Sequence, residues 1–364
     1  MWVRSISATD FRNLSLSDIS FKQGVNILYG DNAQGKTNIL EAVYFCALGR
    51  SVRADNNREL VRFNADEAHI QVDVCRENYS FTIDAHIKIS GNKSTKTLSI
   101  DKSPVKNTRE IFGRLMVVLF SPEDLRLIKA GPAERRRFMD MEICQLSPVY
   151  YSHLRDYHRA LKQRNGLLKQ LRRDRSYQDS LSIWDEQLNI SGCRVMRTRS
   201  AFVNKISVIA REIHGNITGG KEELSLTYQP NITQPENYVK QMQKSHERDI
   251  QSGTTSVGIH KDDILFTING IPARNFGSQG QQRTAALSAK LAEIEIMRSG
   301  AKSTPILLLD DVLSELDGSR QRFLLTQILD LQTILTCTGL EDVLAKNVSD
   351  ANIMRVKSGE ISKE

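Results

Sequence analysis

Apolar and polar positions alternate along most of the first 120 residues. The alternating segments are rich in β-branched residues and cover 3–11, 16–21, 25–30, 68–75, 79–89, 95–101 and 114–120. A period of two residues with Val, Ile and Thr is typical of strands that bury one face. The N-terminal part of the chain is therefore predicted to be strand-rich.

Helical spacing interrupts these strands. In residues 36–49, apolar side chains recur as on one face of a helix, and Gly49 marks its end. Pro122 and Pro132 each stand where a helix could begin, since proline suits the first helical turn.

Residues 145–215 have a different pattern. Apolar residues recur there at near-heptad spacing in two series, Leu154, Tyr157, Leu161, Leu168, Leu171 and then Leu188, Val195, Phe202, Ile206, Ile209, Ile213. Two antiparallel helices are the natural prediction. Residues 155–175 hold eight Lys/Arg and two Asp, so the first helix is strongly basic outside its apolar stripe. A solvated face and a DNA-contacting face both fit this charge.

Strand-like segments return after the helical region, at 223–228, 262–268, 305–311, 332–338 and 352–359, with helical stretches between several of them. The simplest organisation is one α/β domain built from 1–145 and 216–364. Residues 146–215 would then form an inserted basic helical-hairpin lobe.

Composition narrows the functional classes. Of 364 residues, 40% are hydrophobic, and no apolar run approaches the ~20 residues that span a bilayer. The N-terminal sequence does not resemble a secretory signal, so a cytoplasmic protein without membrane association is expected. Five scattered cysteines and seven histidines show no metal-ligand spacing, which predicts no zinc site. The net charge of +7 is compatible with a polyanionic partner.

A glycine-rich segment follows the strand predicted at 25–29. It fits Gly-x-x-x-x-Gly-Lys-Ser/Thr and consists of Gly30, Asp31, Asn32, Ala33, Gln34, Gly35, Lys36 and Thr37. Between a strand and a helix, the N–H groups of such a loop surround phosphates, and its glycines allow close approach. We expect Lys36 to reach the β- and γ-phosphates and assist their chemistry, and the Thr37 hydroxyl to ligate Mg²⁺.

A second anchor for the metal is predicted near the C-terminal end. Four apolar residues, 306–309, read as a strand buried on both faces, and Asp310 and Asp311 follow at its carboxyl end. We expect Asp310 to support Mg²⁺, directly or through water, and Asp311 to polarise the attacking water. Capping of the next helix is the alternative, which the phosphate loop makes less favoured.

The stretch FGSQGQQRT at 276–284 precedes an apolar-rich helical run. Ser278 can cap a helix beginning near Gln281, with its N–H groups aimed outward past Gly280. By itself this is a simple capped helix. One nucleotide does not need two helix N-termini, so we predict that Ser278, Gln279, Gly280 and Gln281 meet the γ-phosphate bound by a second copy of the chain.

These motifs resemble a known architecture. A phosphate loop, a Ser-x-Gly-Gln turn far downstream, an acidic strand and the sequence from Ser314 to Asp317 look like an ABC-type ATPase head of the SMC branch. With FRNL (11–14), FSPEDL (120–125) and GPAERRRFMD (131–140), the combination resembles the bacterial RecF family of recombination-repair proteins. The blocks spread over nearly the whole chain.

The resemblance implies a weak ATPase whose ATP-bound homodimer binds single-stranded, gapped or junction DNA. RecF proteins act in DNA repair, recombination, replication-fork maintenance and the SOS response, and help RecA loading with RecO and RecR. ATP and Mg²⁺ would be the cofactors, and Ser314 and Asp317 would shape the dimer interface.

Three points stay open at the level of sequence. An ATP-hydrolysing subunit of a transport complex and a nucleotide-regulated scaffold are alternative functions. Either Thr336 or Thr338 could replace the switch histidine of transporter ATPases, and no water-orienting glutamine can be placed. Ile259 and Lys261 depart from the expected GPHRDD motif, which puts a specific phosphate contact at Lys261 in doubt, because lysine lacks the bidentate geometry of arginine.

Overall fold

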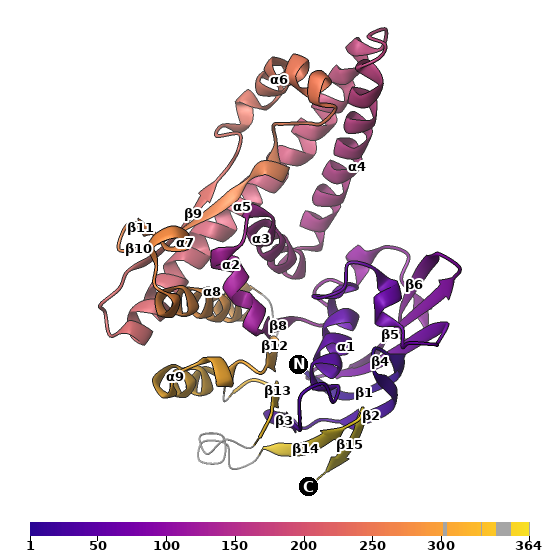
Figure 1. The fold of residues 1–364 in the computed structure, drawn as a ribbon, viewed down its shortest axis with the longest axis vertical. Coiled ribbons are helices and arrows are strands. Elements are labelled where there is room, and N and C mark those ends of the chain that lie inside the picture. The colour runs from indigo at the N-terminus through magenta and orange to yellow at the C-terminus, as the bar shows by residue number, and fades with distance from the viewer. Residues whose placement is uncertain (301–303, 329, 340–350, 364) are drawn as a thin grey trace. The chain divides into compact units, whose positions relative to one another are not determined.

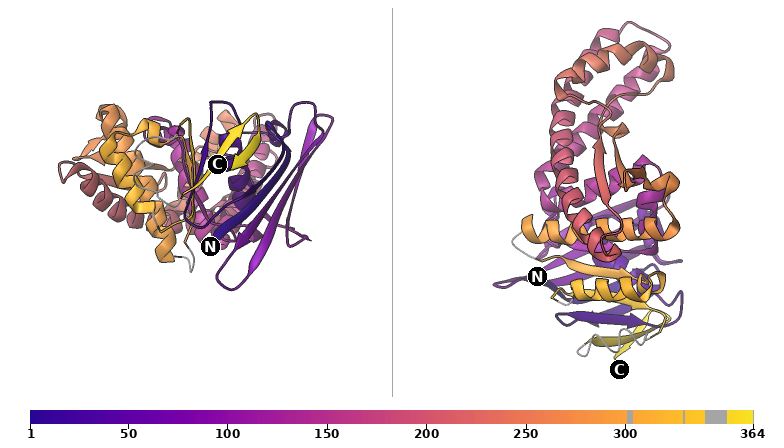
Figure 2. Two further views of the ribbon diagram at one scale, coloured as in Figure 1. Left: turned by 90° about the horizontal axis from the view of Figure 1, so that it is seen from below. Right: turned by 90° about the vertical axis from the view of Figure 1, so that its left-hand side faces the viewer.

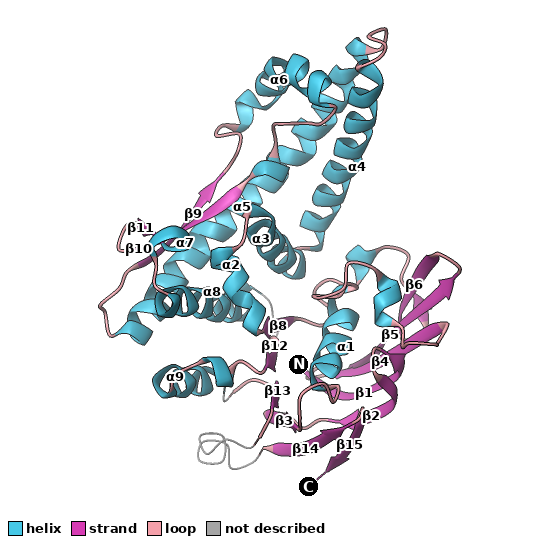
Figure 3. Ribbon diagram, viewed as in Figure 1, coloured by secondary structure: helices cyan, strands magenta, loops and turns pink. Residues whose placement is uncertain are grey.

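The computed structural model describes residues 1–300, 304–328, 330–339 and 351–363. The chain divides into two compact units. Unit 1 consists of Met1–Asp124 and Met297–Glu364, and unit 2 is Leu125–Ile296. Strands dominate unit 1 and helices dominate unit 2 (Figure 3). The insertion predicted at 146–215 lies inside unit 2, which extends beyond it on both sides.

A six-stranded mixed sheet forms the centre of unit 1, in the order β15-β14-β3-β13-β12-β8. Its strands are β3 Val25–Tyr29, β8 Val117–Phe120, β12 Ile306–Asp310, β13 Thr333–Cys337, β14 Asn352–Lys357 and β15 Glu360–Lys363. All neighbours pair in parallel except β14 and β15. Residues 306–309 of β12 are fully buried, as expected for an inner parallel strand.

A second sheet of unit 1 is antiparallel, in the order β2-β1-β4-β5-β6-β7. Its strands are β1 Trp2–Phe11, β2 Leu14–Ser20, β4 Glu67–Cys75, β5 Ser80–Ser90, β6 Lys93–Ile100 and β7 Ser103–Pro104. In β4 and β5, buried and partly exposed residues alternate. The predicted strands of the N-terminal region are thus confirmed.

Helix α1, Lys36–Leu48, contacts strands of both sheets and is almost entirely buried (Figure 1). Gly49 ends it in a left-handed conformation, with φ of 66°, as predicted. The remaining segments of unit 1 are short helical turns and one further helix: η1 Asn57–Leu60, η2 Thr108–Glu110, η3 Pro122–Leu125, which continues into unit 2, η7 Leu313–Glu315 and α9 Gly318–Ile328.

Unit 2 is built on a long helical hairpin of α4, Pro148–Leu171, and α5, Leu181–Thr218. The two helices lie side by side (Figure 1 and Figure 2). A three-stranded sheet, β11-β10-β9, packs on α5 through β9. The remaining elements are α2 Arg126–Lys129, α3 Pro132–Leu146, η4 Gln178–Ser180, β9 Leu224–Gln229, η5 Pro235–Asn237, α6 Tyr238–Ser252, η6 Ile259–Lys261, β10 Asp263–Ile268, β11 Ile271–Pro272, α7 Ala273–Phe276 and most of α8 Gln279–Gly300.

The apolar stripes of the hairpin are largely buried as predicted, but one cation of α4 is not on the surface. Arg164 is fully buried and forms ion pairs with Asp185 of α5 and Asp249 of α6, each at 2.8 Å. The charge count over 155–175 therefore overstates the exposed basic surface by one residue. Among the described residues, no helix is long and apolar enough to cross a membrane.

Candidate nucleotide site and signature turn

The phosphate loop joins β3 to α1 in unit 1, as its sequence predicts. Gly30 has φ of 151° and Gly35 has φ of 108°, a range that side chains rarely adopt. Gly35 is also the N-cap of α1 and supplies no capping side chain. The first N–H groups of the helix therefore have no capping side chain, and free N–H groups at a helix start can bind phosphate oxygens.

Lys36 folds its side chain back over the loop. Its Nζ donates to the carbonyl oxygens of Gly30, at 2.6 Å, and Asp31, at 2.7 Å, and the residue is only 7% exposed. In the described part of the chain, no carboxylate lies within 4.0 Å of this ammonium. A buried cation with only neutral partners calls for an anion, so the loop fits a nucleotide phosphate.

Strand pairing brings the acidic strand to the same loop. Thr37 Oγ1 donates to Asp310 Oδ1 at 2.7 Å, although 273 residues separate the two in sequence. Parallel pairing of β12 with β13 places Asp310 beside Thr336, whose hydroxyl also donates to Asp310 Oδ1, at 2.9 Å. A hydroxyl and a carboxylate oxygen are hard ligands suited to Mg²⁺, so these residues fit the metal.

The residue after Asp310 has an unusual backbone. Asp311 has φ of 52°, which is uncommon for a residue with a side chain, and its N–H donates to Thr336 Oγ1 at 3.0 Å. Thr336 is buried and connects both aspartates, whereas Thr338 is exposed. Of the two candidates for the switch position, only Thr336 lies in this arrangement.

The signature turn lies in unit 2 at the start of α8. Ser278 Oγ accepts from Gln281 N at 3.2 Å, and Gln281 Oε1 accepts from Ser278 N at 2.8 Å. This reciprocal pair is a capping box, so the predicted cap is present. The helix begins at Gln279 rather than near Gln281, because the cap closes on the third residue of the helix.

The exposed side of the turn is formed by few residues. Ser278 and Gln279 are exposed and Gly280 is partly exposed, while the Gln281 side chain also donates to Glu222 Oε1 at 3.0 Å. Phe276 is 72% exposed immediately before the turn. The turn thus presents a helix N-terminus to solvent.

Ser314 and Asp317 follow the acidic strand, and both are exposed. Ser314 Oγ donates to the carbonyl oxygen of Asp311 at 2.7 Å, which closes the turn after β12. Asp317 caps α9: its Oδ1 accepts from Ser319 and from the N–H of Arg320. These hydrogen bonds, that from the Ser319 hydroxyl first, lower the pKa of Asp317 to about 2.

Comparison with known proteins places this arrangement in a family. The family model described as the RecF/RecN/SMC N terminal domain matches residues 2–361. A protein of Lachnospira eligens named DNA replication and repair protein RecF is 46% identical, with all of both chains covered. The chain belongs to the RecF family. A RecF of Clostridium acetobutylicum is 41% identical, over 100% of this chain and 99% of its own.

The solved structures that are similar to this chain support the same family. One described as the recombination mediator protein RecF-ATP in the RecFOR pathway is 33% identical, with a TM-score of 0.92, and covers 100% of this chain and 97% of its own. An Smc head domain derived from Pyrococcus furiosus, bound to the C-terminal domain of ScpA, is 16% identical with a TM-score of 0.56 and shares the fold alone. The predicted ABC-type ATPase head is therefore confirmed as the fold class.

The sequence did not predict two hydrogen bonds that hold the phosphate loop of this RecF-family chain in place. Gln34 Oε1 accepts from Ser358 N at 2.5 Å, and the Gln34 carbonyl accepts from Gly359 N at 2.9 Å. Both partners lie in the turn between β14 and β15, with φ of 51° and 82°. The Ser-Gly pair between two strands is a hairpin signal, but nothing in the sequence says where that hairpin docks.

A second missed group lies behind the loop, at Glu41 of α1. This buried carboxylate accepts hydrogen bonds from Arg12, Arg53 and Ser51. Burial alone would raise the pKa of Glu41, but these hydrogen bonds and the charge of Arg53 outweigh it and hold the pKa below its ordinary value. The sequence does offer one signal for this group, because Glu41 is the only carboxylate in the apolar run ILEAVYF.

The neighbouring Asn13 connects Arg12 to the loop. Its Nδ2 donates to the carbonyl oxygen of Ala33 at 3.3 Å, and its Oδ1 accepts from Asn38 of α1 at 2.7 Å. The FRNL block that contributed to the resemblance thus contacts the loop from its outer side.

The departure at Ile259 and Lys261 falls in η6 of unit 2. Ile259 is buried, and Lys261 is exposed with no carboxylate within 4.0 Å among the described residues. The neighbouring Asp262 is buried and accepts from Arg199, Tyr228 and the N–H of Asn231. Burial raises the pKa of Asp262 despite these partners. Except for the exposed Lys261, the residues of this segment therefore stabilise the packing within unit 2.

Proposed function

We propose that this chain is an ATP-dependent DNA-binding protein of recombinational repair and replication-fork maintenance. The observation that carries the proposal is the contact between Thr37 and Asp310, which joins the phosphate loop to the acidic strand in a chain of the RecF family. The structure described as RecF-ATP, at 33% identity, supports ATP as the nucleotide. The proposed location is the cytoplasm.

Roles follow from the positions of the side chains. The N–H groups of residues 30–37 and the Lys36 ammonium would hold the phosphates, and Thr37 with Asp310 would hold Mg²⁺. A bound Mg²⁺ would neutralise charge on the phosphate oxygens. Asp311 would orient and polarise the attacking water, and its left-handed backbone directs its side chain differently from that of Asp310.

The second half of the site would come from another copy of the chain. Ser278, Gln279, Gly280 and Gln281 form an exposed, capped helix start that fits the γ-phosphate of a partner, and Ser314 and Asp317 would shape the interface beside it. ATP would then hold two copies together as a homodimer that clamps single-stranded, gapped or junction DNA. Slow hydrolysis would release it.

Proposed partners follow from the relatives. Solved structures described as belonging to the RecFOR pathway suggest that RecO and RecR act with this chain, and that the assembly assists loading of RecA. The full-length similarity to proteins named for DNA replication and repair weighs against a subunit of a transport complex. A nucleotide-regulated scaffold would share the ATP site but would not bind DNA.

The proposal is tested by measuring DNA binding and molecular mass together. Binding to a gapped duplex is followed by fluorescence anisotropy, and mass by light scattering, with ATP, with ADP and without nucleotide. We expect ATP, but not ADP, to produce a dimer and to raise DNA affinity at least tenfold. Lys36→Met should lose both effects because it no longer binds ATP.

Lys22→Met removes an exposed lysine from the same unit and is the matched control, which should behave as the unmodified chain. DNA affinity that does not depend on nucleotide would contradict the ATP-dependent switch. Normal ATP binding without any DNA affinity would favour the scaffold.

A further inference from the structure

One face of α4 carries a regular row of cations. The row repeats every three or four residues and consists of Arg155, Arg159, Lys162, Gly166, Lys169 and Arg173, with glycine at one place. At 100° per residue these positions lie within a narrow stripe of the helix surface. Arg173 follows the end of α4, where a turn with Arg173 N donating to Gln170 O continues the helical direction. We call this stripe the α4 basic face.

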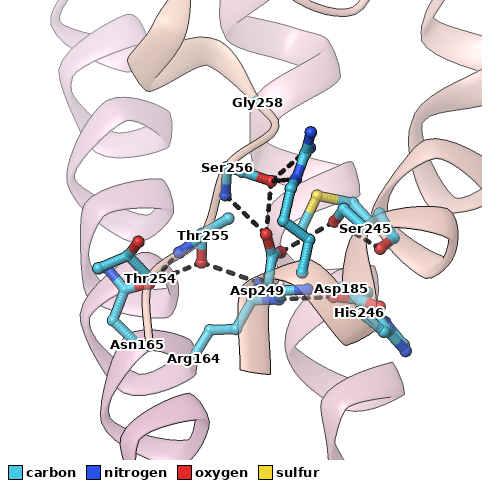
Figure 4. Close-up of polar contacts among 12 residues, drawn as sticks. Arg164, Asn165, Asp185, Ser245, His246, Asp249, Thr254, Thr255, Ser256 and Gly258 are labelled. Carbon is cyan, nitrogen blue, oxygen red and sulfur yellow. Dashed lines mark hydrogen bonds and ion pairs between the residues drawn. The ribbon is translucent and has the colours of Figure 1, made fainter. Parts of the chain in front are cut away.

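The opposite side of α4 packs against the rest of unit 2, and this packing fixes the direction in which the basic face points. Arg164, opposite the basic face, pairs with Asp185 and Asp249, and on the flank of the helix Asn165 Oδ1 accepts from the N–H and the hydroxyl of Thr255 (Figure 4). Leu168 and Leu171 pack in an apolar cluster with Leu181 and Ile250. Because these contacts lock the rotation of α4, the basic face points away from the body of unit 2.

Most of the charges on this face are exposed and have no ion pair within the described residues, and Arg155 is partly exposed. Arg155 has an ion pair with Asp156 at 3.3 Å. Over the described residues, no carboxylate lies within 4.0 Å of the cationic groups of Arg159, Lys162, Lys169 and Arg173. Cations at this spacing repel one another, and of those within α4 only Lys169, in the last turn, interacts favourably with the helix dipole, so most of the row does not stabilise the helix. A function that requires an anion explains its presence better than packing does.

Gly166 is a second, independent feature of the face. It is exposed, its φ is not positive, and a Cβ added to it would meet no atom within 4 Å. Neither backbone conformation nor packing therefore requires glycine here, although glycine weakens a helix relative to alanine. The missing side chain leaves a gap in the middle of the row through which another backbone can approach closely.

The end of the row opens into a hollow of about 750 Å³, lined by Lys169, Gln170, Arg172 and Arg173. Three of these four residues are cations, and none of the four is an apolar anchor. An interface with a protein would need buried aromatic or aliphatic side chains at its centre, which this face does not offer. Phosphate groups in a flexible chain suit it better.

We propose that the α4 basic face binds the sugar-phosphate backbone of DNA, with the strand passing close over Gly166. This inference rests on the proposed function and names the surface that performs it. From Arg155 to Lys169 the face extends about 21 Å along the helix axis. One strand of a duplex carries about six phosphates over that length, at ~3.4 Å each.

The test compares two variants of equal charge. Lys162→Gln with Lys169→Gln removes two charges from the basic face, and Lys240→Gln with Lys244→Gln removes two exposed charges from α6. Binding to gapped duplex DNA with ATP is measured by anisotropy over a range of salt concentrations. The first variant should bind about tenfold more weakly, with a slope of log K against log salt reduced by about 2. The α6 variant should keep the unmodified slope.

Gly166→Met supplies a readout that does not change charge. A Cβ at Gly166 meets no atom within 4 Å, and methionine favours a helix more than glycine does, so the melting temperature should stay equal or rise, while DNA affinity should fall several-fold. If Gly166→Met and the double glutamine variant both bind DNA like the α6 control, the inference is wrong, and a protein partner or none uses this face. If the unmodified chain itself shows no ATP-dependent DNA binding, the proposed function fails instead.

Discussion

Gly30 shows how one backbone position connects the phosphate loop with a distant strand. Its φ is 151°, and a Cβ built on it would lie 2.3 Å from the carbonyl oxygen of Val356 in β14. We expect Gly30→Ala to push the loop away from β14 and to weaken ATP binding by at least tenfold, because the phosphate-binding N–H groups move with the loop. Titration with a fluorescent ATP analogue measures this effect.

Gly24→Ala is the matched control for that substitution. Gly24 also has positive φ, 82°, but its added Cβ would meet nothing within 4 Å. It should cost about 1 to 2 kcal/mol of stability through its backbone alone and leave ATP affinity intact. Equal losses of affinity in both variants would show that strain in the backbone, and not the contact with Val356, is responsible.

At the scale of single residues, the sequence predicted those that belong to a continuous motif. It did not predict contacts between residues that are far apart in sequence and are brought together by the fold. The pattern at 30–37 and the acidic pair at 310–311 were recognisable because each motif is continuous in sequence. Gln34 and Ser358 are 324 residues apart, and no local pattern encodes their hydrogen bond. The choice between Thr336 and Thr338 likewise needed the register of β12 against β13.

Among the elements, the short helix η6 and its loop have a defined chain of hydrogen bonds around His260. Its Nε2 lies 3.0 Å from the carbonyl oxygen of Thr255, which can only accept, so Nε2 carries the proton. Its Nδ1 then accepts from the Tyr157 hydroxyl at 2.8 Å, which in turn accepts from Tyr238 at 3.3 Å. Neutral histidine, with its proton on Nε2, satisfies every donor and acceptor of this chain of hydrogen bonds.

This arrangement predicts a loss of stability in mild acid. Burial, outweighing the hydrogen bond to Thr255, lowers the pKa of His260 from 6.5 to about 4. As pH falls, the unfolded chain binds a proton before the folded one, so the contribution is fully present above pH 6.5 and is lost between pH 6.5 and 4. Going from pH 7 to 5 should lower the free energy of unfolding by about 2 kcal/mol.

Urea unfolding at several pH values checks this expectation. His260→Gln cannot titrate and should reduce the dependence between pH 7 and 5, whatever its stability at neutral pH; the part that stays comes from groups such as His158, whose pKa burial also lowers. A variant with the same pH dependence as the unmodified chain would assign the effect to other groups.

The elements themselves were predictable because periodicity reports burial. Alternation in 68–75 predicted a strand, and the heptad series in 145–215 predicted the helical hairpin. The position of Arg164 was not predictable, since an arginine in a basic helix normally faces solvent. Only the meeting of α4, α5 and α6 brings Asp185 and Asp249 to it. Removal of one member of such a buried group leaves the others uncompensated, which makes the group a determinant of how the hairpin packs.

For the whole molecule, the central prediction concerns the sharing of one site by two chains. Lys36→Met breaks the phosphate loop, and Ser278→Arg places a long cation on an exposed helix start. Each variant alone should fail to hydrolyse ATP or dimerise. In an equal mixture, only a dimer that contains one of each can form, and it has one intact site of two, so up to about half of the normal hydrolysis should return.

Ser278→Ala separates this effect from a loss of the helix cap. It removes the hydrogen bond from Gln281 N to Ser278 Oγ, which costs about 1 kcal/mol, but adds no bulk or charge, so it should weaken dimerisation much less than Ser278→Arg does. The rate of ATP hydrolysis and the mass by light scattering are measured for each variant and for the mixture. A mixture as inactive as its components would mean that each chain builds its nucleotide site alone, because complementation requires that the helix start of one chain reach the phosphate loop of the other.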